Sequence, residues 1–334
     1  MTKKVVISGY YGFGNFGDEL ILSILTQHLK KLGVETVVLS SNPRKTSMEH
    51  FVNAIHSFNF HQVAGLIKQS DILISGGGSL LQDVTSVKSL LYYLWVIFTA
   101  LRYKKDVIIF AQGIGPISNL VAKFLTKYFL KRCKYISVRD YKSQNLLENW
   151  GISSDLVCDP AFSLEIPSAN NEGIVGVQLR DFSTMNNTLL NKLARQIVKD
   201  FYDKKIRIFS LQNELDLEIC KKFDGILKSL KPDIQTEIVT ENIVQNIYEL
   251  EYMIGMRFHA LIIALKSGVK SVGINYDIKV EKLAKESGIP LISMNASENF
   301  DDVFRQMQLL DMNKVREFII NQKFEWSKFD NLLK

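Results

Sequence analysis

An arginine and a histidine stand two residues apart where an apolar strand changes to a helical pattern, in "YMIGMRFHALIIALKSG". We expect Arg257 and His259 at the start of that helix, which Gly268 closes. A helix N-terminus binds anions, an arginine clamps a carboxylate or phosphate, and a histidine transfers protons. Arg180, at the end of the strand "GVQLRD", should reach the same place. The pattern predicts a site for a small, strongly anionic ligand, with simple helix capping as the alternative.

Glycine loops follow three other predicted strands: Gly12, Gly14 and Gly17; Gly76, Gly77 and Gly78; and Gly113 and Gly115. Glycine allows positive φ and close approach of a ligand. We therefore expect a pocket for a polyhydroxyl ligand such as a sugar, lined by Gly14, Asn15, Asp18, Gly77, Gly78, Ser79, Gln82 and Asp83. Plain strand-to-helix turns are the alternative. Asp18 has two open roles, a ligand for a hydroxyl group or the cap of a helix.

The first loop, "GFGNFG", formally matches the dinucleotide-binding fingerprint. That fingerprint needs an acidic residue about 20 positions on, at the end of the second strand. Here the strand "ETVVLSSN" ends in Ser40, Ser41 and Asn42. Asp18 and Glu19 would also repel a bound pyrophosphate. Because Walker, zinc-ligand and nucleophile-elbow motifs are missing too, the sequence predicts neither a redox cofactor nor a metal.

These loops need a scaffold of strands that alternate with helices. Unbroken Val/Ile runs such as "KVVIS", "TVVLS" and "DVIIF" are typical of parallel strands covered on both faces. The alternation predicts an α/β fold with two doubly wound Rossmann-like domains facing a cleft. We expect an N-terminal domain over 1–165, a polar linker "EIPSANNEG", and a C-terminal domain over 172–312. A last helix within 313–334 should pack back on the first domain.

Composition is that of a globular protein, with 334 residues, 46% hydrophobic and 23% charged. The N-terminus shows no signal-peptide pattern, and three scattered cysteines favour a reducing compartment such as the cytoplasm. The segment 102–142 holds ten basic residues and two acids. This excess suggests an anionic membrane surface, with a solvated helix face as the alternative. Nucleic acid is not expected, because no recognition motif accompanies the bases.

A set of motifs in this order resembles the bacterial polysaccharide pyruvyl transferases, specifically the CsaB type. They are "GYYGFGNFGDE", "SGGGSLLQDVTS", "AQGIGP", "SVRD", "DPAF", "MRFHALIIAL" and "GINYDIKV". Two positions depart from the family pattern. Ala111 stands where we expect a glycine, and Ile278 stands where proline is usual.

The resemblance implies a fold like that of GT-B glycosyltransferases. It implies transfer of an enolpyruvyl unit from phosphoenolpyruvate to a lipid-linked sugar, N-acetylmannosamine in the CsaB type, to give a cyclic ketal. That ketal serves to anchor S-layer proteins. The family's R-x-H motif maps to Arg257 and His259, and its separate arginine to Arg180. A GT-B glycosyltransferase that uses a nucleotide sugar, and a non-catalytic sugar-binding module, are the other two readings.

Overall fold

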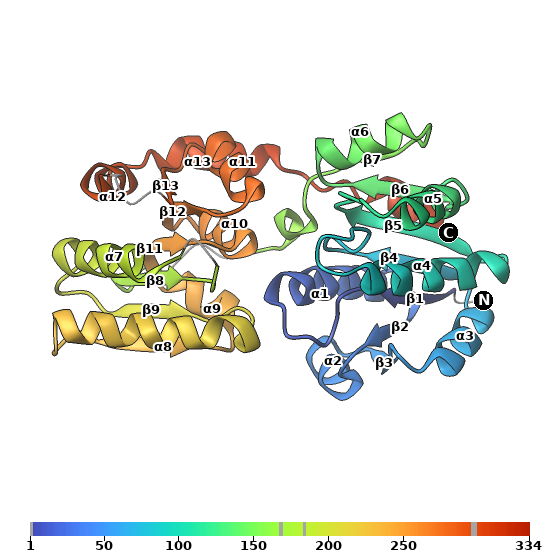
Figure 1. Ribbon diagram of the computed structural model, residues 1–334, viewed down its shortest axis with the longest axis horizontal. Coiled ribbons are helices and arrows are strands. Elements are labelled where there is room, and N and C mark those ends of the chain that lie inside the picture. Colours follow the sequence, from blue (N-terminus) through green and yellow to red (C-terminus); the bar gives the residue numbers. More distant parts are fainter. Residues whose placement is uncertain (1–2, 167–169, 183–184, 295–298) are drawn as a thin grey trace. The chain divides into compact units, whose positions relative to one another are not determined.

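The computed structural model describes residues 3–166, 170–182, 185–294 and 299–334. The chain folds as two compact units (Figure 1), one of Met1–Ser163 with Lys323–Lys334 and one of Leu164–Gln322. Each unit has one fully parallel sheet with helices between its strands. The prediction of two doubly wound α/β domains is therefore confirmed.

The first unit has seven strands in the order β3-β2-β1-β4-β5-β6-β7. They are β1 (Lys4–Ser8), β2 (Glu35–Ser40), β3 (Asn53–His56), β4 (Ile72–Gly76), β5 (Asp106–Gln112), β6 (Tyr135–Val138) and β7 (Asp155–Leu156). The central strands are buried along almost their whole length, as their unbroken apolar runs require. The strand order reverses between β1 and β4, so the chain leaves these two neighbours in opposite directions.

Helices cover both faces of this sheet. They are α1 (Phe16–Lys31), α2 (Pro43–His50), α3 (Phe60–Gln69), α4 (Val87–Arg102), α5 (Leu120–Leu130), α6 (Tyr141–Asn149) and α14 (Ser327–Leu333), with a 3-10 turn at Pro160–Ser163. Successive strand side chains point to opposite faces. Val6 joins the core under α3, α4 and α5, whereas Ile7 joins the core under α1 and α14. The unit thus has two separate apolar layers.

The longest apolar run of the sequence lies within α4. Leu90, Tyr93, Leu94 and Ile97 of this helix are buried in the core of the first unit. Among the described residues, no helix is long and apolar enough to span a bilayer.

The second unit has six strands in the order β10-β9-β8-β11-β12-β13. They are β8 (Ile174–Gln178), β9 (Ile206–Phe209), β10 (Thr236–Val239), β11 (Leu250–Gly255), β12 (Lys270–Asn275) and β13 (Leu291–Ser293). The helices are α7 (Asn187–Asp200), α8 (Asn213–Leu230), α9 (Ile243–Tyr248), α10 (Phe258–Ser267), α11 (Ile278–Ser287), α12 (Phe300–Gln308) and α13 (Met312–Asn321). Here the order reverses between β8 and β11.

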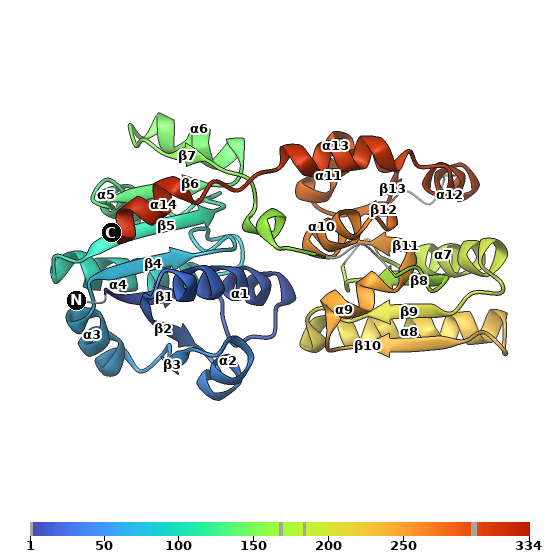
Figure 2. The same cartoon turned by 180° about the vertical axis from the view of Figure 1, so that it is seen from behind.

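The C-terminal segment holds two helices where one was expected within 313–334, and the second of them packs on the first unit as predicted. α13 contacts α10 and α11 and belongs to the second unit. After five residues outside any helix, α14 lies across β5 of the first unit (Figure 2), where Phe329 meets Phe110 with ring centroids 5.0 Å apart. Trp326 stacks on His28 at 3.7 Å, and Asp330 lies 2.6 Å from the same imidazole.

We predict that Phe329→Ala lowers the free energy of unfolding by about 3–5 kcal/mol, the usual cost of emptying a buried aromatic site. Phe329 is only 2% exposed, whereas Leu309, at 77%, supplies the control. Urea unfolding of Phe329→Ala and Leu309→Ala measures both. Equal, small effects would show that α14 adds nothing to the first unit.

Candidate active site

The reversal of strand order in the second unit brings two of the predicted arginines together. β8 and β11 pair in parallel, with Gln178 opposite Gly255 at their carboxyl ends. Arg180 follows β8 by two residues, and Arg257 follows β11 by two. In open α/β sheets ligands bind at this edge, beside the point of reversal.

Gln178, at the end of β8, is fully buried. Its Oε1 accepts hydrogen bonds from the backbone N–H of Arg257 at 2.6 Å and of Met256 at 3.2 Å. Its Nε2 donates to the carbonyl of Leu179 at 2.8 Å. One side chain therefore fixes the spacing of the two segments that carry Arg180 and Arg257.

A carboxylate from the first turn of α8 holds the guanidinium of Arg257. Nη2 of Arg257 lies 2.9 Å from Oδ1 and 3.0 Å from Oδ2 of Asp216. Asp216 is fully buried and also accepts the backbone N–H groups of Gln212 and Leu211, at 3.1 and 3.3 Å. Nε of Arg257 is buried and has no hydrogen-bond partner within the described residues. This orphaned donor is suited to an anionic ligand.

Tyr276, just after β12, completes the edge. Its ring centroid lies 5.8 Å from the guanidinium carbon of Arg180. Burial raises the pKa of Tyr276, and this outweighs the nearby Arg257 and Arg180, which lower it; Asp277 adds to the rise. The phenol is thus protonated at neutral pH and can donate a hydrogen bond.

His259 is the second residue of α10, for which Arg257 is the N-cap. Its ring is half-buried and meets Phe258 edge-on, with centroids 5.4 Å apart. The first turn of a helix carries N–H groups without an intrahelical partner and a partial positive charge. His259 therefore stands beside two arginines at a position that favours an anion.

The carboxyl ends of β8, β11 and β12 thus gather Arg180, Arg257, His259 and Tyr276 in one neighbourhood. The first three follow the sequence prediction. Gln178 and Asp216 were missed, since each looks like an ordinary polar residue of a strand or helix. Tyr276 lies in the motif "GINYDIKV", but its neighbours come from other strands. Guanidinium, phenol and helix N–H groups are all donors, so the site suits a compact polyanion.

The predicted sugar site of the first unit lies at the corresponding reversal, between β1 and β4. Asn15 is the N-cap of α1, and its side chain accepts hydrogen bonds from the backbone N–H of Gly17 (3.1 Å) and Asp18 (3.4 Å). Asp18 is therefore not the helix cap. Its carboxylate lies over Gly78, where an added Cβ would come within 2.4 Å of Oδ1.

The glycine loops come close to each other around this carboxylate. Gly77 and Gly78 are buried and have φ of +63° and +67°, which L side chains rarely adopt. Gly14 has φ +69°, and apart from its two chain neighbours no described residue has an atom within 4 Å of where its Cβ would be. Ser79 is half-buried, with its Oγ 2.6 Å from the corresponding point on Gly113. The structure thus brings Asp18 into contact with Gly78, and Gly77 and Ser79 are the neighbours of Gly78 in the chain.

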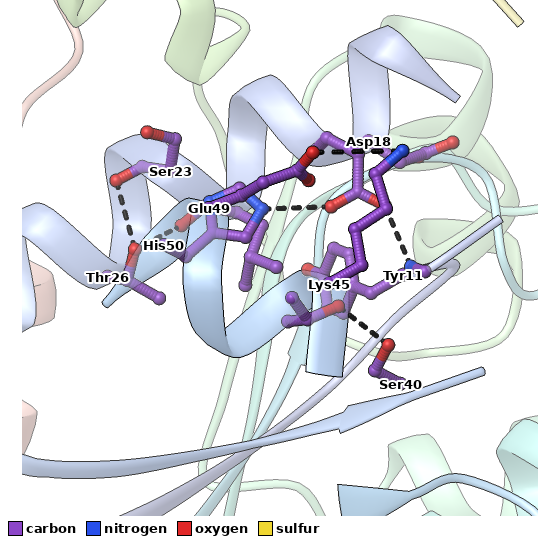
Figure 3. A network of polar contacts seen from close by, with 12 residues as sticks. Tyr11, Asp18, Ser23, Thr26, Ser40, Lys45, Glu49 and His50 are labelled. Carbon is purple, nitrogen blue, oxygen red and sulfur yellow. Dashed lines mark hydrogen bonds and ion pairs between the residues drawn. The ribbon is translucent and has the colours of Figure 1, made fainter. Parts of the chain in front are cut away.

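A polar network that includes Tyr11, Lys45, Glu49 and His50 supports the first loop (Figure 3). Glu19 accepts the backbone N–H of Gly12 at 2.7 Å and the Nε2 of His50 at 2.9 Å. The hydroxyl of Tyr11 donates to the carbonyl of Gly76 at 3.0 Å, which joins the first loop to the second. Burial, with Asp18 and Glu19 nearby, raises the pKa of Tyr11 well above its ordinary value. The network is structural support for the loops.

This network also contains three side chains of metal-ligand type. In the described part of the chain, ligand atoms of Glu19, Glu49 and His50 lie within 4.8 Å of one another. Lys45 lies 3.7 Å from Glu49, and Glu19 is already bonded to His50 and to a backbone N–H. Nζ of Lys45 therefore supplies the positive charge, and we assign the group as an ion-pair network.

Gln82 and Asp83 both form hydrogen bonds within the protein, Gln82 inside its own loop and Asp83 with the segment before α5. Gln82 donates to Oγ1 of Thr85 at 2.7 Å and accepts its N–H at 3.1 Å. Oδ2 of Asp83 accepts the backbone N–H groups of Asn119 (2.7 Å) and Ser118 (2.8 Å). These bonds hold the pKa of Asp83 below its ordinary value. Asp83 thus ties the loop after β4 to the start of α5.

The two departures from the family pattern have a backbone explanation. Ala111 has φ +46°, in the left-handed region where glycine is preferred. Ile278 is the first residue of α11, the helical position that best accepts proline. Both substitutions keep the local fold at a small conformational cost.

Comparison with known families decides the assignment. A family model described as "Polysaccharide pyruvyl transferase" matches residues 15–278. The chain belongs to this family. The matched range runs from the N-cap of α1 to the first residue of α11, so it contains every residue of the two candidate sites except Gly14. Membership makes the protein a transferase of polysaccharide pyruvylation. No curated protein matches this transferase in sequence.

Solved structures similar to this transferase share the GT-B-like fold. A glycosyltransferase from Rickettsia africae has a TM-score of 0.64 at 16% identity, covering 100% of this chain and 98% of the other. Anabaena HepE in complex with UDP-glucose has a TM-score of 0.63 at 12% identity, covering 99% of this chain and 98% of the other. A UDP-GlcNAc 2-epimerase from Methanocaldococcus jannaschii has a TM-score of 0.61 at 12% identity, covering 97% of this chain and 95% of the other. At such identities the likeness confirms the fold alone.

We predict that Asp216→Asn destabilises the transferase by about 3–5 kcal/mol, because it leaves the buried guanidinium of Arg257 without a counter-charge. Adding Arg257→Met should recover part of the loss. Glu218→Gln, on the same helix and 86% exposed, is the control. Urea unfolding of the single and double variants gives the free energy of interaction between Asp216 and Arg257. Strictly additive losses would exclude a buried ion pair.

We predict that Asp83→Asn lowers the melting temperature at neutral pH. A depressed folded-state pKa adds stability above the unfolded value, about 4, and this is lost as pH falls through the folded pKa. The gap to wild type should therefore close on acidification. Melting curves between about pH 7 and pH 3 test this, with the exposed Glu148→Gln as control. A gap that is independent of pH would contradict it.

Proposed function

We propose that this transferase moves the enolpyruvyl group of phosphoenolpyruvate onto a sugar and closes it to a cyclic pyruvate ketal, with release of phosphate. As in the CsaB type, the acceptor is N-acetylmannosamine of a lipid-linked secondary cell-wall polysaccharide precursor. The product would then anchor S-layer proteins. The donor site is the edge that carries Arg180, Arg257 and His259.

The main support for this proposal is that Arg180, Arg257 and the N-terminus of α10 lie together at one edge of the second sheet. Phosphoenolpyruvate has a carboxylate and a phosphate on adjacent atoms, which two guanidinium groups can bind together. The orphaned Nε of Arg257 adds a donor where one is needed. Asp216 keeps that guanidinium in place before the ligand arrives.

In the proposed reaction a proton adds to C3 of phosphoenolpyruvate, and C2 becomes electrophilic. One sugar hydroxyl oxygen bonds to C2, the bond from C2 to the phosphate oxygen breaks, and a second hydroxyl closes the ring. Of the two hydroxyl protons, one balances the proton on C3 and the other leaves with phosphate. His259 is the acid/base, and the arginines stabilise the phosphate as its charge develops.

The sugar would bind at the glycine loops of the first unit. Asp18 can accept hydrogen bonds from two hydroxyls, and Gly77 and Gly78 let the backbone approach the ring. Gly14, Asn15 and Ser79 line the same loops, and Gln82 and Asp83 brace them. A lipid-linked acceptor would hold the enzyme at the cytoplasmic face of the plasma membrane, where the basic segment 102–142 meets anionic headgroups.

The test is phosphate release from phosphoenolpyruvate with a synthetic ManNAc–GlcNAc diphospholipid. We predict a kcat about 10²–10⁴-fold lower in His259→Ala, the usual contribution of a positioned acid/base. His61→Ala, an exposed histidine elsewhere in the chain, is the control. Arg180→Ala should mainly raise KM for phosphoenolpyruvate.

Two outcomes would count against the proposal. Unchanged turnover and pH dependence in His259→Ala would remove the acid/base role. Binding of UDP or GDP, without thermal stabilisation by phosphoenolpyruvate, would favour a nucleotide-sugar glycosyltransferase on the same fold.

A further inference from the structure

The helix layer formed by α3, α4 and α5 contains no carboxylate. These helices read "FHQVAGLIKQ", "VKSLLYYLWVIFTALR" and "LVAKFLTKYFL", all within the described residues. Their fixed charges are all positive: Lys68, Lys88, Arg102, Lys123 and Lys127. The three helices cover one face of the seven-stranded sheet together with α6, which carries Lys142 and Glu148, and α4 packs between α3 and α5. The surface formed by α3, α4 and α5 thus has one sign of charge.

The outer face of α5 is apolar as well as basic. Leu120, Val121 and Phe124 are 80%, 67% and 66% exposed, and Tyr128 is 44% exposed and stacks on Phe124. On α4 the exposed Phe98 packs against Phe129 of α5, with ring centroids 5.8 Å apart, so the neighbouring helix also carries an exposed aromatic ring. Contiguous exposed apolar side chains on a globular unit mark an interaction surface.

Cations are interleaved with these apolar groups. Lys123 and Lys127 lie on α5 between the exposed side chains. Arg132 lies over the ring of Tyr128 at 3.6 Å and donates to the carbonyl of the same residue at 2.7 Å. Lys134, by contrast, is paired with Asp106 at 2.6 Å. The positive charge is therefore concentrated on the face that also carries the apolar side chains.

We propose that α5 lies in the interface of an anionic bilayer, with Leu120, Val121 and Phe124 entering the headgroup–acyl boundary. Amphipathic helices with lysines beside bulky apolar groups bind membranes in this way. A second copy of the chain would oppose two faces of like charge, which disfavours a symmetric dimer. The proposal rests on the proposed lipid-linked acceptor and adds apolar insertion to the electrostatic contact.

The experiment is co-sedimentation of the full chain with phosphatidylcholine vesicles that do or do not contain phosphatidylglycerol. Wild type should bind the anionic vesicles. Leu120→Ser with Phe124→Ser should weaken this by about tenfold or more, the loss expected for two large apolar side chains. Lys123→Glu with Lys127→Glu should weaken it at low salt. Leu309→Ser, an equally exposed leucine of the second unit, should change nothing.

Circular dichroism of each variant first establishes that it is folded. A tryptophan introduced by Phe124→Trp reports insertion by its fluorescence. After subtraction of the wild-type spectrum, its emission maximum should shift to the blue when anionic vesicles are added. Failure of wild type to bind overturns the proposal, as does binding that the serine variants leave unchanged. Loss of dimers in the serine variants would instead identify a second copy as the occupant.

Phosphate release with a soluble acceptor that lacks the lipid separates the two proposals. Leu120→Ser with Phe124→Ser should retain this activity, because neither residue belongs to the donor or acceptor site. If wild type binds vesicles but releases no phosphate with either acceptor, the proposed reaction fails and the membrane surface stands. If wild type releases phosphate but does not bind vesicles, the membrane proposal fails and the proposed reaction stands.

Discussion

Parallel pairing of β8 with β11 is the constraint on which the proposed donor site depends. The connections that follow β8 and β11 run in opposite directions along the sheet. The carboxyl ends of both strands therefore stay uncovered at one edge. Gln178 then bonds the backbone that follows β11, which sets the distance between the two arginine-bearing segments. The same reversal at β1 and β4 exposes the glycine loops. Both sites are thus consequences of sheet topology.

Fixed charge is organised differently at the two sites. In the second unit a buried carboxylate, Asp216, holds Arg257 from behind and leaves other donors of the guanidinium for a ligand. Such preorganisation means that the site need not rearrange as charge develops. In the first unit Glu19 and His50 brace the backbone instead, and Asp18 is the carboxylate that lies against the glycines.

The two helix layers of the first unit differ in charge. The helices on the α1 side carry the acids Asp18, Glu19, Glu49 and Asp330 together with bases such as Lys30, Lys31 and Lys45. On the other face α3, α4 and α5 carry lysine and arginine alone, and α6 adds Glu148 beside Lys142. The unbalanced positive charge of that face therefore lies on α3, α4 and α5.

Short sequence patterns were enough to predict most of the strands and the position of the arginine–histidine pair. Apolar runs marked the strands, glycines marked the loops after them, and a strand-to-helix change located Arg257 and His259, because each signal lies within a short window. The elements α2, β3 and α3, within 43–69, gave no clear pattern. The partnership of Arg257 with Asp216, 41 residues away, and of His28 with Asp330, 302 away, came only from the tertiary structure. So did the cap at Asn15 and the outward face of α5, since packing decides which side of a helix is buried.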